Sequence, residues 1–251
     1  MTEKWLIAPG EERVIDIENV TRLKIGLVGG QVDVIAHDEP GIRIEVHGVT
    51  TKDLRIEAND GEVEIDHPQL GWDNFLEVFR NFGSGGPKAE VSVAVPRSIA
   101  LNLGVVSAGA LVSGIRNDAR LNTVSGDLIV DTLIGDLTVN SVSGDVQVRG
   151  LTGSISANSV SGDVAVTGTI RRATVDIVSG STLVDAAGDV NAINVNSVSG
   201  GTTVRLDESL AANYVVRSLS GRLLIDGVER GSSGINTVSY THLRAHETSL
   251  H

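Results

Sequence analysis

Aspartates recur at a fixed spacing in the second half of the chain, and carboxylates are the side chains with which proteins bind calcium. Asp127, Asp145 and Asp163 each follow a glycine and lie 18 residues apart. Stacked about 4.8 Å apart on neighbouring turns of a coil, they would repel one another, and a cation would relieve that repulsion. Calcium-binding repeats of nine residues, however, use Gly-Gly-x-Gly-x-Asp, and each unit here has one Gly and one Asp. We therefore expect solvated turn carboxylates and no metal ligands, with calcium (Ca) binding as the alternative.

Asparagines form a second column with nearly the same spacing: Asn122, Asn140, Asn158, Asp176 and Asn196, followed by Arg217. Stacked Asn side chains can hydrogen-bond to one another between turns, as amide ladders do. Carbohydrate grooves usually add aromatic platforms, and residues 99–239 contain only Tyr214. We therefore expect a structural ladder, with binding of cell-envelope glycans as the less favoured alternative.

No arrangement typical of catalysis is found in the sequence. The chain has no Cys, and it contains no Gly-x-Ser-x-Gly, phosphate-binding loop or dinucleotide fingerprint. His37, His47 and His67 fall in predicted strand ends or turns. Hydrolysis of a glycoside needs two carboxylates at a defined separation, whereas the aspartates here are periodic turn residues. The sequence predicts a protein that is not an enzyme and uses no cofactor; a carbohydrate-active enzyme is the least favoured alternative.

The charge balance argues against nucleic acid as a partner. The chain carries 20 basic and 32 acidic residues, a net charge of −12, and it has no basic tract. No run of about 18 apolar residues is present, so we expect no transmembrane segment. Residues 1–10 lack the long apolar stretch of a secretory signal. As written, the sequence predicts a cytoplasmic protein, with peripheral association with the envelope as the alternative.

An 18-residue repeat positions these side chains. Its marker is a serine in the motif Val-Ser-Gly or a close variant, at Ser107, Ser125, Ser143, Ser161 and Ser179, with looser copies at Ser199 and Ser220. Three aliphatic columns accompany the serines: one four residues before them (Leu103 to Val216), one five residues after them (Val112 to Ile225), and one directly before them (Val106 to Leu219). Columns at one phase predict side chains that stack on one another in the core.

Glycines also recur every nine residues, from Gly126 to Gly162. Each nine-residue unit reads as a turn followed by a short alternating strand. A left-handed hexapeptide coil would need an aliphatic residue every six positions, and Asp136 and Ser154 break that rule. We therefore predict an all-β fold, a single-chain β-solenoid over residues 99–239. The favoured form is a right-handed β-helix with rungs of about 18 residues in two halves; an antiparallel stack of hairpins is the rival.

Residues 1–98 are β-rich but less regular, and we expect them to form the N-terminal part or cap of the same solenoid. One segment holds all three Phe and one of the two Trp of the chain. The phenylalanines have helical spacing and Asp73 can cap the start, so we predict a short amphipathic helix at about 73–82. It either covers the solenoid edge or contacts a protein partner, a second copy or a membrane surface. The candidate interaction surface is Trp72, Phe75, Phe79 and Phe82.

The end of the chain breaks the pattern. Residues 235–239 begin another copy of the repeat, which demands glycine at the next position, where the chain has Tyr240. Residues 240–251 resemble translated read-through of a sequencing-library adaptor, and we expect them to be a non-native, disordered tail. The alternative is a metal site formed by His242, His246 and His251.

The repeated Val-Ser-Gly-Asp-Val, after a strand-rich N-terminal region, resembles the bacterial β-strand-repeat proteins named "putative adhesin" or "toastrack", many of which are domains of unknown function. The resemblance covers roughly residues 5–239. It implies a β-solenoid without catalytic activity, often with envelope or surface roles. The sequence thus predicts a non-catalytic scaffold or adhesin-like interaction protein that acts by surface presentation or self-association. A ligand-binding module for cations or envelope glycans is the alternative.

Overall fold

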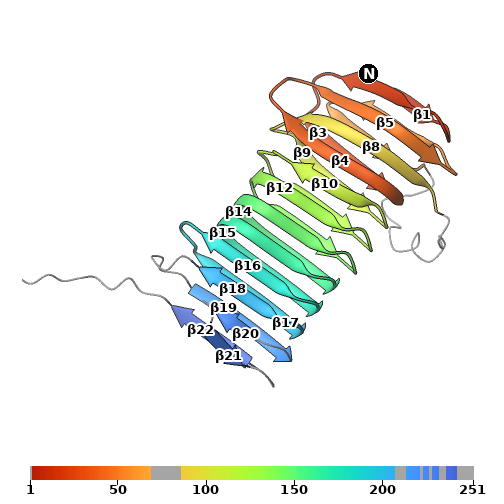
Figure 1. Ribbon diagram of the computed structural model, residues 1–251. Coiled ribbons are helices and arrows are strands. Elements are labelled where there is room, and N and C mark those ends of the chain that lie inside the picture. Colours follow the sequence, from red (N-terminus) through yellow and green to blue (C-terminus); the bar gives the residue numbers. More distant parts are fainter. Residues whose placement is uncertain are drawn as a thin grey trace, which may run out of the picture.

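The computed structural model is a two-sheet β-solenoid whose strands stack along one axis, from the N-terminal end in red to the C-terminal end in blue (Figure 1). The residues that the structure describes are 2–68, 86–206, 213–220, 223–225, 228–231 and 236–241. These residues form strands and turns and contain no helix. Each turn of the coil, here called a rung, gives one strand to each sheet.

Parallel strands build the regular part of both sheets. The first sheet has the order β4 (Gly29–His37), β10 (Gly109–Ser113), β12 (Leu128–Ile134), β14 (Val146–Ser161), β15 (Val164–Ser179), β16 (Thr182–Ala187), β18 (Thr202–Leu206) and β20 (Leu223–Ile225). The second sheet has the order β3 (Arg22–Leu27), β9 (Ala100–Val105), β11 (Ala119–Thr123), β13 (Leu137–Ser141), the second halves of β14 and β15, β17 (Ala192–Ser199) and β19 (Asn213–Ser220). The parallel pairing confirms the solenoid and excludes the rival stack of antiparallel hairpins for the repeats.

Two of the predicted aliphatic columns lie in the core between the sheets. Val130 pairs in register with Val112 and Val148, and Leu121 pairs with Leu103. The column four residues before the serines is buried from Leu103 to Val216, and the column five residues after them is buried from Val112 to Val204. Burial of each such side chain contributes roughly 1.5–3 kcal/mol, so these stacks are the main source of stability.

The third predicted column lies outside the core over most of its length. Val106 and Val124 are buried, but the next five members are 41–51% exposed. The expectation that all of them stack inside is therefore wrong. Each follows an inward-facing residue, such as Ser159 or Ile177, and neighbours in an extended strand point to opposite faces. We call the exposed members the corner ridge: Val142, Val160, Val178, Val198 and Leu219.

Glycine is required at the corner beside this ridge, because successive rungs lie backbone to backbone there. A Cβ atom on Gly144 would lie 2.0 Å from the carbonyl oxygen of Gly126, which no real contact allows. Gly162 has in addition a φ of +114°, a conformation that L residues rarely adopt. The close stacking of the rungs thus explains why the third residue of the Val-Ser-Gly motif is glycine.

Six strands extend the two sheets at the N-terminal end. In the second sheet, β7 (Glu62–Asp66) pairs parallel with β3, and β6 (Leu54–Asn59) and β1 (Glu3–Ile7) follow with antiparallel pairing. In the first sheet, β8 (Lys88–Pro96) pairs parallel with β4, and β5 (Ile42–Thr50) and β2 (Arg13–Ile17) follow with antiparallel pairing.

The chain leaves β7 and enters β8 at the corner of the solenoid that carries the ridge. Asp66 pairs with Gly26 and Lys88 pairs with Gly29, so both ends of this connection lie where β3 passes into β4. The predicted helix at 73–82 lies within this connection, outside the described residues.

Antiparallel strands also end the described part of the chain. β21 (Val228–Gly231) pairs with β20, and β22 (Asn236–Thr241) pairs with β19, with Val238 opposite Val216. Because the chain reverses direction after β20, residues 236–239 do not form another parallel rung, although their sequence echoes the repeat. The disordered tail was expected to begin at Tyr240, but Tyr240 and Thr241 belong to β22. Residues 242–251 lie outside the described part.

Candidate functional site

A groove of about 610 Å³ runs along the corner of the solenoid beside the ridge. Val160, Val178, Val198 and Leu219 of the corner ridge form one wall of this groove, which we call the corner groove. Their side chains are 44–51% exposed and lie in successive rungs. The volume falls within the range of about 300–1,000 Å³ that is typical of sites for small ligands. The wall offers a continuous apolar strip to whatever binds there.

The amide column forms the opposite wall of the corner groove. Asn140 Nδ2 donates to Asn122 Oδ1 at 2.9 Å, and Asn158 Nδ2 donates to Asn140 Oδ1 at 3.0 Å. Further along, Asn196 Nδ2 donates to Asp176 Oδ1 at 2.7 Å. The predicted ladder is thus confirmed at these positions. It satisfies the amides within the wall and leaves the ridge as the main apolar surface.

The floor of the groove consists of the inward-facing residues that precede the ridge members. Ser141 Oγ donates to the carbonyl oxygen of Gly144 at 2.7 Å and so binds the neighbouring corner. Ile177 occupies the equivalent position one rung beyond Ser159. Ser197 Oγ is buried without a hydrogen-bond partner in the described part of the chain. The floor of the groove is thus formed by small hydroxyl side chains and by Ile177.

The candidate interaction residues from the sequence, Trp72, Phe75, Phe79 and Phe82, lie outside the described residues, so the structure does not place them. The corner ridge was not predicted from the sequence, although a signal for it exists. The column directly before the serines lies three residues from the buried column that begins at Leu103. An odd separation in an extended strand places two columns on opposite faces.

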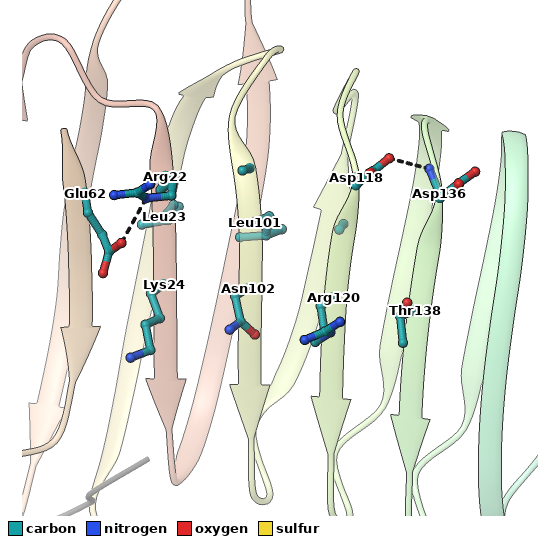
Figure 2. A pocket seen from close by; sticks show the side chains of 12 residues that line it. Arg22, Leu23, Lys24, Glu62, Leu101, Asn102, Asp118, Arg120, Asp136 and Thr138 are labelled. Atoms are coloured by element: carbon teal, nitrogen blue, oxygen red, sulfur yellow. Dashed lines mark hydrogen bonds and ion pairs between the residues drawn. The ribbon is translucent and has the colours of Figure 1, made fainter. Parts of the chain in front are cut away.

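A second pocket of about 350 Å³ lies on the outer face of the second sheet (Figure 2). Lys24, Asn102, Arg120 and Thr138 form a row across four neighbouring strands, as the register requires. Arg22 at the edge donates to Glu62 at 3.0 Å. Positive side chains thus line the middle of this pocket, and buried Asn102 Oδ1 has no hydrogen-bond partner among the described residues.

Two aspartates close one end of this second pocket and support strand stacking. Asp118 Oδ1 accepts the N–H of Asp136 at 2.8 Å, and Asp136 Oδ1 accepts the N–H of Ser154 at 3.1 Å. Arg171 lies 3.4 Å from Asp136. Carboxylates held by the backbone of the next rung are poorly placed for the acid and base roles of a hydrolase.

The aspartate column that suggested calcium binding is also engaged by the backbone. Asp127, Asp145 and Asp163 accept the N–H of the residue one rung further on at 3.0, 2.8 and 2.7 Å respectively. Each carboxylate therefore ties two rungs together through a charge-assisted hydrogen bond. Among the described residues, no group of three or more His, Cys, Asp or Glu is arranged to hold a metal ion.

A partly buried ion pair at the N-terminal end escaped the sequence analysis. Arg55 Nε donates to Asp66 Oδ1 at 2.7 Å, and the Asp66 side chain is 1% exposed. The hydrogen bond and charge of Asp66 raise the pKa of Arg55. The pairing arises because β6 and β7 form a hairpin that places the two residues opposite each other.

The three histidines of the N-terminal part have separate environments. Nδ1 of His37 accepts the N–H of Glu39 at 3.0 Å, and Nε2 of His47 lies 2.9 Å from Ser92 Oγ. His67 is fully buried, and both of its ring nitrogens lack a hydrogen-bond partner in the described part. Burial lowers the pKa of His67 to about 4, so its ring is neutral at pH 7.

The described residues include no helix with the length and apolarity needed to cross a bilayer. No curated protein matches the chain. Among solved structures, a "putative adhesin" from Bacteroides fragilis is 16% identical, with 88% of this chain and 96% of that chain covered and a TM-score of 0.46. A "putative adhesin" from Parabacteroides distasonis is 14% identical, with the same coverage and a TM-score of 0.40. A "putative lipid binding protein" from the same species is 15% identical, covers 87% and 94%, and has a TM-score of 0.39.

With identities of 14–16% and TM-scores below 0.5, these structures do not assign the chain to a family. The sequence of the chain does. The model of one family, described as Toastrack DUF4097, matches residues 20–248 and so spans most of the chain. The matched range includes the N-terminal strands from β3 onward and the parallel rungs. With its Val-Ser-Gly rungs and its two-sheet solenoid, this chain belongs to the Toastrack DUF4097 family.

Proposed function

We propose that this protein is a non-catalytic, adhesin-like scaffold that acts through its surface and by self-association. The observation that carries the proposal is the corner ridge, whose five aliphatic side chains are 41–51% exposed in successive rungs. Single exposed aliphatic residues are ordinary on soluble proteins, whereas here five of them line up in successive rungs and form one continuous apolar row.

The mechanism in this proposal is geometric. Each rung stacks on its neighbours through two core columns, the amide ladder and the aspartate hydrogen bonds, and this makes the solenoid a stiff support. Side chains on its corner are therefore held at a fixed spacing of about 4.8 Å per rung. A rigid row of this kind loses little conformational entropy when a partner binds.

Residues 72–82, which we call the aromatic segment, belong to the proposed contact surface on the basis of their sequence. The segment concentrates all three Phe of the chain in residues 75–82. Large aromatic side chains dominate the energetics of protein contacts. We therefore extend the proposal to Trp72, Phe75, Phe79 and Phe82 as contact residues.

Light scattering over a range of concentrations tests self-association. The wild-type chain is expected to exceed the monomer mass of 26.2 kDa as the concentration rises. The double variant Phe75→Ala/Phe79→Ala should stay monomeric, while Val14→Ala, at a position 52% exposed on β2, should behave as wild type. A wild-type chain that stays monomeric and captures no partner in a pull-down would contradict the proposal.

Because an adhesin acts at the cell surface, we also propose that the protein is peripherally associated with the cell envelope. The name "adhesin" that two solved structures bear describes those proteins, and we extend it to this chain by proposal only. Cell fractionation followed by a carbonate wash tests this part. A peripheral protein should pellet with membranes and be released by the wash, and recovery in the first soluble fraction would argue against it.

A further inference from the structure

The corner groove is a mainly apolar feature of the described surface that the fold itself does not use. Four members of its wall, from Val160 to Leu219, lie in successive rungs. With the uncharged Asn158 and Asn196 on the other side, the groove has only Asp176 and Arg217 as charged residues along its length. Such a surface favours an apolar occupant with a few polar groups at its edges.

The size of the ridge argues against two ridges packed face to face. Five side chains at a spacing of about 4.8 Å give a strip about 19 Å long, and a width of roughly 10 Å gives about 200 Å². A stable protein interface buries about 800 Å² on each partner. The groove is therefore suited to a short inserted segment rather than to a flat contact between two solenoids.

A segment that fills such a groove needs large apolar side chains close together in sequence. The chain has five Phe and Trp residues in all; Trp5 packs against the core, and the other four lie between positions 72 and 82. Aromatic side chains bury about 150–250 Å² each, so two or three of them would cover the groove. The aromatic segment is thus the part of this chain whose chemistry fits the groove.

The same copy cannot supply the whole segment. Its connection starts after Pro68 and ends before Gly86, at the corner one rung beyond β3 and β4. Trp72 and Phe82 lie four residues from these anchors and reach at most about 14 Å along the solenoid, whereas Phe75 and Phe79, seven residues away, reach at most about 25 Å. Val160 lies five rung spacings away, or about 24 Å, and the rest of the groove is more distant.

The positive charge of Arg217, at the far end of the groove, is complementary to acidic residues of the aromatic segment. Arg217 Nη1 donates to Asn196 Oδ1 at 3.3 Å, and no ion pair is found for Arg217 among the described residues. The aromatic segment carries Asp73 and Glu77 against one basic residue, Arg80, so its net charge is negative. A carboxylate from the segment would form a charge-assisted hydrogen bond with this guanidinium.

From these observations we propose that the corner groove of one copy binds the aromatic segment, residues 72–82, of a second copy. The proposal rests on the proposed function, since it names the surface through which the chain self-associates. It predicts head-to-tail contact, because the connection that carries the donor segment leaves β7 and enters β8 at the N-terminal end, whereas the acceptor groove lies towards the C-terminal end. Such a contact is heterologous, and repetition of it gives a closed ring or an open chain of molecules.

A labelled peptide tests the acceptor directly. A fluorescein-labelled peptide of residues 70–84 is titrated with the full-length protein, and its anisotropy is measured. Binding to the wild-type chain is expected to weaken at least tenfold in Val178→Asp, because the aspartate places a charge in the middle of the apolar wall. The matched control is Ile129→Asp in β12, at a position that is 41% exposed and outside the groove. It should bind within twofold of wild type, and circular dichroism checks that both variants are folded.

The outcomes separate this inference from the proposed function. Absence of peptide binding, or equal binding by wild type and Val178→Asp, overturns the groove as acceptor, even when light scattering shows self-association that depends on Phe75 and Phe79. Groove-dependent peptide binding by a chain that stays monomeric at every concentration overturns the second copy as occupant. Groove-dependent binding together with concentration-dependent mass supports the inference.

Discussion

Adding one methyl group at the corner of the solenoid should destabilise it strongly. In Gly144→Ala the new Cβ atom would lie 2.0 Å from the carbonyl oxygen of Gly126, about 1.4 Å closer than an ordinary contact allows. No side chain can move away, because the contacted atoms belong to the backbone of Gly126 and the new Cβ is fixed to the backbone of residue 144. The two rungs must separate locally, which strains the hydrogen bonds on both sides of the corner. Overpacking of this kind costs about 1–3 kcal/mol and more where nothing can relax, so we expect about 3 kcal/mol.

The matched control is Gly201→Ala. Position 201 shares its register with Asp163 and Ser181, which carry side chains there, and a Cβ atom on Gly201 would meet nothing within 4 Å. Thermal unfolding followed by circular dichroism measures both variants. For a chain of this size, about 3 kcal/mol corresponds to a fall in Tm of roughly 6–12 °C, whereas Gly201→Ala should change Tm by less than about 3 °C. Equal melting temperatures for the two variants would refute the account of rung stacking.

Three further predictions concern the ladders and a buried histidine. Asn140→Ala removes one hydrogen bond to Asn122 and one from Asn158 and should lower the free energy of unfolding by about 1–2 kcal/mol in urea titration; an unchanged midpoint would show that the ladder is not stabilising. Millimolar calcium should leave the Tm unchanged, because the aspartate column already accepts backbone N–H groups, and a rise of several degrees would contradict this. Burial lowers the pKa of His67 from 6.5 to about 4, so the unfolded chain takes up a proton first as the pH falls, and stability should decline between about pH 6.5 and pH 4 by up to about 3 kcal/mol. His67→Leu should flatten that decline in urea titrations at several pH values, and an identical pH dependence would exclude His67 as its cause.

The regular part of the fold could be predicted from the sequence because its repeat is strict. Val112, Val130 and Val148 recur every 18 residues and lie in register in the core, as a stack of rungs requires. The strand direction at the two ends could not be predicted in this way. The antiparallel pairing of β22 with β19 follows from the reversal of the chain after β20, and the residues of β22 still resemble the parallel repeat.

The candidate site was only partly accessible to sequence reasoning. The amide ladder was predicted from spacing alone, since Asn122 and Asn140 must become neighbours once the rungs stack. The corner ridge was misplaced into the core because the spacing of its column was considered without its phase relative to the column of Leu103. The ion pair of Arg55 with Asp66 depends on hairpin register, which the two-residue turn at Asp60 and Gly61 sets, so a signal for it was present in the sequence.

The most direct measurement of the central claim is the mass of the Val178→Asp variant as a function of concentration, compared with wild type and Ile129→Asp. The account predicts that wild type and Ile129→Asp grow beyond 26.2 kDa with concentration while Val178→Asp remains a folded monomer. If Val178→Asp associates as strongly as the wild-type chain, the corner ridge is not the surface through which this solenoid acts.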